Sequence, residues 1–281
     1  MFDMRYHIAS LGAVFLALTV GLLLGSLLTD SGTATRRQAK LMESINSDVN
    51  NIQQQNQLLE KEISDLKTFQ SQVWRAAVKG RLTDQKIAVI SLSAHQDELY
   101  DSLSKALVQA GAKSDHLKLD VAAVNFGDAV LVGKLAASIS STETTTTFEA
   151  IFWPRLAQEI SGREPLLLTG ALINLGLLSV DDQSGLPADG VVLLASKKGT
   201  VDDRDTKLLS AFRQVPGLPL IGAETDTFKP SRISAYQLTG ASTIDNINTI
   251  PGWISMTYLL QQNSVKASFG VKSTADRLLP Q

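Results

Sequence analysis

The chain begins with a long apolar run. Residues 8–29 contain no charged side chain. A helix of this length, rising about 1.5 Å per residue, crosses a hydrocarbon core of about 30 Å. A cleaved signal peptide has a shorter apolar region and a small-x-small cleavage site, whereas here Leu27 and Leu28 continue the run past Gly25 and Ser26. The pattern therefore predicts an uncleaved membrane-spanning helix. Residues 1–30 are expected to comprise a short cytoplasmic tip and this transmembrane helix.

Two features of this run concern its packing and its orientation. Gly21 and Gly25 form a GxxxG pair, a spacing that allows two membrane helices to approach closely, so we expect them in helix packing. One basic residue, Arg5, precedes the run, and three follow it within residues 36–40. Counting basic residues alone favours a cytoplasmic C-terminus.

A seven-residue repeat follows the polar break at residues 31–33 and continues for about five heptads. Its d positions are all aliphatic, and the a positions are interrupted by Asn56 and Gln70; a buried Asn at a favours a parallel two-stranded register. Glu62 at g and Lys67 at the following e form an attractive pair across such a dimer. The alternative is one amphipathic helix packed on its own domain. We predict a parallel coiled-coil stalk over residues 31–80, with a seam of Met42, Ile45, Val49, Ile52, Asn56, Leu59, Ile63, Leu66 and Val73.

Beyond Gly80, short apolar runs alternate with amphipathic stretches. This alternation predicts an α/β domain over residues 81–281, with a mostly parallel sheet and right-handed crossovers. Residues 86–92 form the first predicted strand, and residues 97–110 form a helix that Gly111 ends. Further strands are predicted at residues 116–120, 190–195 and 218–223, further helices at 164–178, 202–215 and 251–261, and a Thr-rich loop at 140–147.

Composition limits the function classes. The 281 residues fit one domain and a stalk, and the net charge of −2 with scattered basic residues argues against a nucleic-acid partner. The absence of cysteine excludes disulfides, thiolate metal sites and a cysteine nucleophile.

Catalytic patterns are absent from the sequence. It contains no Gly-x-Gly-x-x-Gly, Walker or Gly-x-Ser-x-Gly motif. Of the three histidines, His7 borders the span, which leaves His95 and His116 as possible bases. His95 follows the first strand, where α/β folds bind ligands, but a helix cap is the commoner role there. The acidic residues at 181–182 and 202–205 lack calcium-loop spacing and indicate turns and helix starts. We expect a non-enzymatic protein without a cofactor.

Copper ligands are also dispersed. Cu(I) prefers Cys or clustered Met, and Cu(II) prefers closely spaced His with nitrogen or oxygen neighbours. His95 and His116 are far apart in the sequence, and no second His or Met lies near either. The sequence predicts no high-affinity copper site in one chain. The four methionines are Met1, Met4, Met42 and Met256.

Both ends of the chain resemble a known family. The matching stretches at the start are MFDMRYH, SLGAVFLAL and GLLLGS, and those near the end are STIDN at 242–246, Gly252, residues 269–270 and residues 278–280. These stretches are similar to the actinobacterial MctB family, labelled copper transport proteins. The middle of the chain resembles the family only in layout. The Asp245-Asn246 pair within STIDN is interpreted as a buried or turn-forming Asx pair.

The resemblance implies a membrane anchor, an exposed envelope domain and two competing functions. One is copper efflux or pore formation, and the other is the cell-division role of SteB-like members, which are described as partners of the membrane protein SteA and as regulators of a peptidoglycan hydrolase. Heptads are a partner-binding device, and neither copper ligands nor pore-forming strands are visible in the sequence. We therefore expect a dimeric, single-pass cell-membrane scaffold in the lipid bilayer with an extracytoplasmic C-terminal domain. Copper transport is the alternative, and a cryptic ligand-binding α/β domain ranks third.

Overall fold

The computed structural model describes residues 4–28, 31–92, 96–181, 186–195, 204–262 and 265–280. Contacts divide the chain into two units, Met1–Thr68 and Phe69–Gln281. The division falls inside one long helix, so the last turns of that helix belong to the second unit. The boundaries expected at residues 30 and 80 stay a prediction.

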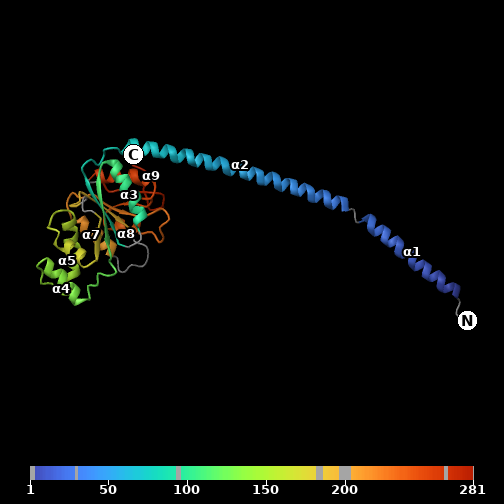
Figure 1. Ribbon diagram of the computed structural model, residues 1–281, viewed down its shortest axis with the longest axis horizontal. Coiled ribbons are helices and arrows are strands. Elements are labelled where there is room, and N and C mark those ends of the chain that lie inside the picture. The colour runs from blue at the N-terminus through green and yellow to red at the C-terminus, as the bar shows by residue number, and fades with distance from the viewer. Residues whose placement is uncertain are drawn as a thin grey trace. The chain divides into compact units, whose positions relative to one another are not determined.

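The first unit contains helix α1 (Met4–Leu28) and most of helix α2 (Ser31–Val78) (Figure 1). Helix α1 carries the apolar run. Helix α2 has no proline, and its one glycine, Gly32, lies in the first turn. The break expected at residues 31–33 is wrong, because these residues already belong to α2. Glycine destabilises a helix little in its first turn, since the first N–H groups of a helix have no partner within the helix.

The second unit is built on a seven-stranded sheet in the order β3-β2-β1-β4-β5-β6-β7. All neighbouring strands are parallel except β2 and β3, so the predicted mostly parallel α/β sheet is confirmed. The order changes direction at β1, which is the doubly wound arrangement. The strands are β1 (Lys86–Ser91), β2 (Lys113–Leu119), β3 (Leu178–Val180), β4 (Gly190–Leu194), β5 (Leu220–Ala223), β6 (Ser242–Ile244) and β7 (Ser268–Phe269).

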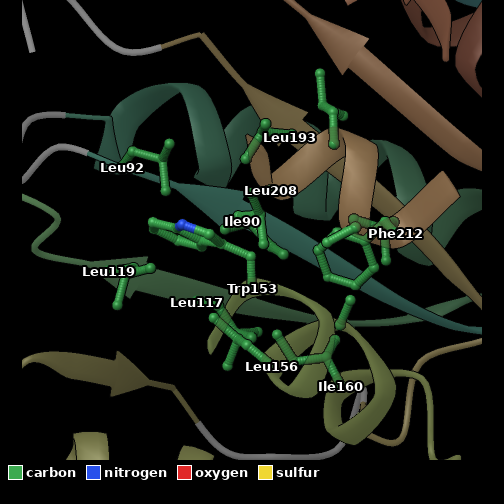
Figure 2. Close-up of a cluster of buried hydrophobic side chains, with 14 of the residues drawn as sticks. Ile90, Leu92, Leu117, Leu119, Trp153, Leu156, Ile160, Leu193, Leu208 and Phe212 are labelled. Atoms are coloured by element: carbon green, nitrogen blue, oxygen red, sulfur yellow. The ribbon is translucent and has the colours of Figure 1, made fainter. Parts of the chain in front are cut away.

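Helices cover both faces of this sheet. Successive strand residues point to opposite faces, and the strands are apolar on both, so each face needs a covering layer of helices. One face packs against α3 (Asp97–Ala110), α9 (Ile250–Gln261) and the end of α2. On the other face, Trp153 and Leu156 of one helix and Phe212 of another close over Ile90 of β1 (Figure 2). The helices of this second face are α4 (Ala129–Ser138), α5 (Phe148–Ile160), α6 (Leu167–Asn174), α7 (Arg204–Arg213) and α8 (Ile233–Leu238).

The last turns of α2 are part of the core of the second unit. Trp74 and Val78, four residues apart on one side of the helix, are both buried. The Trp74 ring lies 5.6 Å from the Trp253 ring of α9, centroid to centroid. Leu82 continues this contact beyond the helix and is fully buried. The chain therefore enters the α/β domain through a packed helix end.

Most predicted elements are present with shifted ends. The first predicted strand and the helix at 97–110 are confirmed, and Gly111 ends that helix with a φ of 92°. The helix predicted at 164–178 is too long: it is α6 alone, because Pro165 precedes it and Gly176 follows it with a φ of 70°. Residues 202–203 of another predicted helix lie outside the described residues, and that helix ends at Arg213 instead of residue 215. The sequence pattern did not predict α4, α5, α8, β3, β6 and β7.

Candidate functional site

The predicted seam residues form an apolar stripe on α2. In this chain the eight apolar members are between 41% and 58% exposed, and Asn56 on the same stripe is also exposed. The stripe follows one side of α2, because heptad positions a and d lie on one side of a helix, and Asn56 and Gln70 interrupt it. Three further apolar residues outside it are exposed as well: Leu41, Leu58 and Phe69. Among the described residues outside α1, the stripe from Met42 to Val73 is the largest set of exposed apolar side chains.

Helix α1 has a surface suited to lipid. Tyr6–Leu27 has a mean hydropathy of 2.3 and is the one helix within the described residues that is long and apolar enough to cross a membrane. Its hydroxyl groups bond back to the helix backbone, as when Thr19 Oγ1 donates to Phe15 O at 2.6 Å. A Cβ added at Gly21 or Gly25 would contact nothing within 4 Å. The predicted packing role of these two glycines stays a prediction.

A Ser, His and Asp come together at the carboxyl end of β1, beside the middle of β2. Ser91 Oγ lies 2.8 Å from His116 Nε2, and His116 Nδ1 lies 3.7 Å from Asp97 Oδ1. The Tyr100 ring of α3 stacks on the imidazole with 4.2 Å between centroids. The pairing of β1 with β2 and the packing of α3 on them create this cluster from residues far apart in the sequence. The order of atoms is that of a hydrolytic triad.

Three observations argue against catalysis at this cluster. Ser91 and His116 are buried, at 0% and 1% exposure, so a substrate cannot reach the hydroxyl. The separation of 3.7 Å between His116 and Asp97 is too long for a hydrogen bond. Asp97 is instead bound by Lys118 Nζ at 2.7 Å. We interpret the cluster as a structural polar contact; His95 lies outside the described residues.

The electrostatics of the cluster keep the imidazole neutral. Burial lowers the pKa of His116, and the nearby Lys118 ammonium lowers it further. The hydrogen bond to Asp97 raises the pKa of Lys118. A neutral His116 can accept a hydrogen bond at Nε2 from the Ser91 hydroxyl, which fits the short distance between them.

The carboxyl ends of β5 and β6 hold a second group of buried charges. Glu224 accepts from Ser231 Oγ at 2.6 Å and from Lys272 Nζ. Asp245 accepts from the backbone N–H groups of Val271 and Lys272 at 2.7 and 2.9 Å. These contacts attach the C-terminal segment to the sheet. Asp245 therefore has a structural role, as the interpretation of a buried Asx residue predicts.

Glycine is required beside this group. Gly270 has a φ of 152°, and a Cβ there would lie 2.0 Å from Asp245 Oδ1. A Cβ on Gly252 would lie 2.1 Å from the carbonyl oxygen of Asn246. The stretches that carry the family resemblance near the C-terminus thus contact one another in the fold.

A third charged group involves α7 and α8. Asp205, in the first turn of α7, accepts from Arg232 Nη2 at 2.6 Å and from the Tyr236 hydroxyl at 2.8 Å. Burial, with Asp205 alongside, raises the pKa of Tyr236 far above its ordinary range. The prediction that the acidic residues at 202–205 start a helix holds for Asp205. The others at this position, and Asp182 of the earlier pair, lie outside the described residues.

The described residues contain no group of three or more His, Cys, Asp or Glu side chains arranged to hold a metal ion. Met42 lies on the exposed stripe of α2, whereas Met256 is fully buried in the core of the second unit. Met1 lies outside the described residues.

These features define a class: an α/β protein with one N-terminal apolar helix of membrane-spanning length, the mark of a single-pass membrane protein. Comparison with protein families then gives the relationship. The chain belongs to the MctB family, described as copper transport outer membrane protein, and the match covers residues 1–280. The family name implies a location in the cell envelope. A search of curated proteins finds no match.

Proposed function

We propose that this protein is a non-enzymatic, membrane-anchored envelope scaffold that dimerises through a parallel coiled coil of α2. The observation that carries the proposal is the exposed stripe of α2. Burying the exposed half of a Leu, Ile, Val or Met side chain contributes about 1 kcal/mol, so eight such residues per chain favour association strongly. A helix of 48 residues with this stripe suits a second copy of itself.

Several features support the parallel arrangement. Both copies are anchored at the same end by α1, which favours helices that run in the same direction. Asn56 at an a position pairs with its equivalent only in a parallel, in-register dimer. Glu62 and Lys67 then attract each other across the dimer.

The proposed partners are proteins of cell division. The resemblance to SteB-like members suggests a SteA-like membrane protein and a peptidoglycan hydrolase that the scaffold regulates. This role requires the α/β domain to lie outside the cytoplasm, against the count of basic residues beside α1. Long domains cross the membrane largely regardless of flanking charge. A reporter that works only in the cytoplasm, fused after Gln281, should stay silent; a strong signal contradicts this topology.

Cysteine cross-linking in membranes tests the dimer, because the natural chain has no cysteine. We expect Leu59→Cys and Leu66→Cys to form disulfide-linked dimers, since a d residue lies close to its equivalent in a parallel coiled coil. Gln54→Cys, on the opposite side of α2, is the matched control and should give little product. Equal cross-linking at all three positions, or none at the seam, contradicts the proposal.

Copper transport is the second candidate, and the family description favours it. Tight Cu(I) binding needs two or three converging soft or imidazole ligands. Within the described residues, His116 is buried and its Nε2 is occupied by Ser91. We expect no stoichiometric binding when the full chain is titrated with Cu(I). Stoichiometric binding would place copper handling first.

A further inference from the structure

Phe69 of α2 departs from the polar pattern beside the apolar stripe. With Met42 at a, Phe69 occupies a g position, and its side chain is 62% exposed. Positions e and g border the seam of a coiled coil, and charged side chains are usual there. The three preceding g residues are polar: Asp48, Gln55 and Glu62. An exposed aromatic ring at the next g position therefore suggests a different contact at this end of the helix.

The heptad identifies the residue opposite Phe69. In a parallel, in-register dimer, a g residue faces the e residue five positions later on the other helix, as Glu62 faces Lys67. The same spacing places Phe69 opposite Trp74. Within one chain the two side chains point apart, because five residues carry the helix one full turn and about 140° further. The Trp74 that Phe69 faces is therefore that of a second copy.

The surroundings of Trp74 offer an apolar surface. Its ring lies 5.6 Å from the Trp253 ring of α9, centroid to centroid. Trp253 is only partly buried, and so are Ile250 and Ile254, which lie on the same side of α9 at a spacing of three and four residues. The e position of α2 thus adjoins a row of partly exposed apolar side chains on the α/β domain.

The domain leaves the seam of its own helix open. It is attached to α2 through Trp74 at e and Val78 at b, whereas Val73 at d remains 41% exposed. Positions e and b lie beside the a and d seam on one side of the helix. A second helix on the seam would therefore run alongside the domain with its g residues toward it.

A solitary exposed apolar side chain is ordinary on protein surfaces, and Leu58 is an example at 67% exposure. Leu58 occupies a c position, which faces away from the partner helix in a coiled coil. Phe69 differs from it in having an aromatic pair opposite. Leu58 is consequently the matched control for Phe69 on the same helix.

We infer that Phe69 of each copy packs against Trp74 and Trp253 of the other copy, so that the dimer interface extends from α2 onto the α/β domain. The inference rests on the proposed parallel dimer and names a contact beyond its seam. Two-fold symmetry gives two such contacts per dimer. Aromatic side chains in edge-to-face or offset packing stabilise an interface beyond the area they bury. Each domain would then be held by its own α2 and by the partner's.

Photochemical cross-linking of the full chain in nanodiscs tests the contact. Replacing Phe69 with the photoreactive analogue benzoyl-phenylalanine should give dimers in which residue 69 is linked to Trp74 or residues 250–254 of the other copy. The same replacement at Leu58 should give no such link. A parallel sample with Leu59→Cys reports dimerisation independently. Disulfide-linked dimers without links from residue 69 overturn the inference and leave the dimer; absence of dimers in both samples overturns both proposals.

Dimer affinity, measured by sedimentation of the full chain in detergent, supplies the second test. Phe69→Ala should weaken dimerisation about tenfold or more, since two aromatic contacts are lost, whereas Leu58→Ala should change it less than about twofold. Trp253→Leu keeps an apolar side chain in the core and should weaken the natural dimer more than the Phe69→Ala dimer, because the two substitutions remove one shared contact. Equal effects of Phe69→Ala and Leu58→Ala, or additive losses, overturn the inference. Thermal unfolding checks that each variant is folded.

Discussion

The two units differ in the exposure of their apolar side chains. Along α2, Leu59 and Leu66 are more than half exposed, whereas Leu103 and Leu208 of the α/β unit are fully buried. The second unit satisfies its hydrophobic residues within one chain. The first has two apolar surfaces that are exposed in this chain: α1, whose composition suits lipid, and the stripe of α2, for which a second copy of the helix is proposed as the partner. Stability is therefore internal in one unit and depends on the environment in the other.

The largest expected effect breaks the association of α2 and leaves the α/β unit intact. Leu59→Asp with Leu66→Asp should abolish dimers, at a cost of more than about 5 kcal/mol, because the dimer would bury four unpaired charges. Sedimentation of the full chain in detergent measures this. Gln54→Asp with Lys61→Asp, on the opposite side of α2, should leave the dimer. A monomeric natural chain at tens of micromolar, on the order of ordinary coiled-coil affinities, contradicts the stalk.

The reverse experiment damages the α/β unit alone. Phe212→Ala removes a fully buried ring from the core of Figure 2 and should lower the free energy of unfolding by about 4 kcal/mol. Chemical denaturation followed by tryptophan fluorescence measures this, since Trp153 lies in the same core. Cross-linking through Leu59→Cys should persist. If it disappears, the two units do not behave independently.

A smaller effect is expected at the C-terminal attachment. Gly270→Ala places a Cβ against the Asp245 carboxylate and should cost about 2 to 3 kcal/mol. Gly133→Ala in α4 is the matched control, because a Cβ there contacts nothing within 4 Å. It should stabilise the protein by up to about 1 kcal/mol, as alanine does within helices. Thermal unfolding compares the two. A neutral Gly270→Ala contradicts the described contact.

The smallest expected effect is a dependence on pH. The pKa of His116 is lowered in the folded state, so the unfolded chain binds a proton first as pH falls below about 6.5. The free energy of unfolding should therefore decrease from pH 7 toward pH 5, by at most about 1.4 kcal/mol per pH unit for this group. His116→Gln should flatten this part of the profile. An unchanged slope means that another group titrates.

Local signals allowed part of the fold to be predicted. The strand β1 and the helix α3 were predicted because an apolar run, a regular stripe and Gly111 lie close together in the sequence. Strands β6 and β7 were missed because three and two residues are too short for a periodic pattern. Helix α5 was missed because it contains Pro154 and follows a Thr-rich loop.

The polar sites depend on contacts between distant residues, so the sequence could not reveal them. Glu224 and Lys272 are forty-eight residues apart, and Ser91 meets His116 only through the pairing of β1 with β2. A hollow lined by Gln85, Asp189 and Leu218 combines residues that precede three different strands, β1, β4 and β5. The seam of α2 is the exception, because a heptad repeat is a local pattern; its partner stays a prediction.

The packed end of α2 sets the boundary of the α/β domain. Trp74 and Val78 belong to the same core as Trp253. A fragment that begins at the first strand would lack both side chains and would leave their neighbours in this core uncovered. A soluble form of the domain therefore has to keep the last turns of α2.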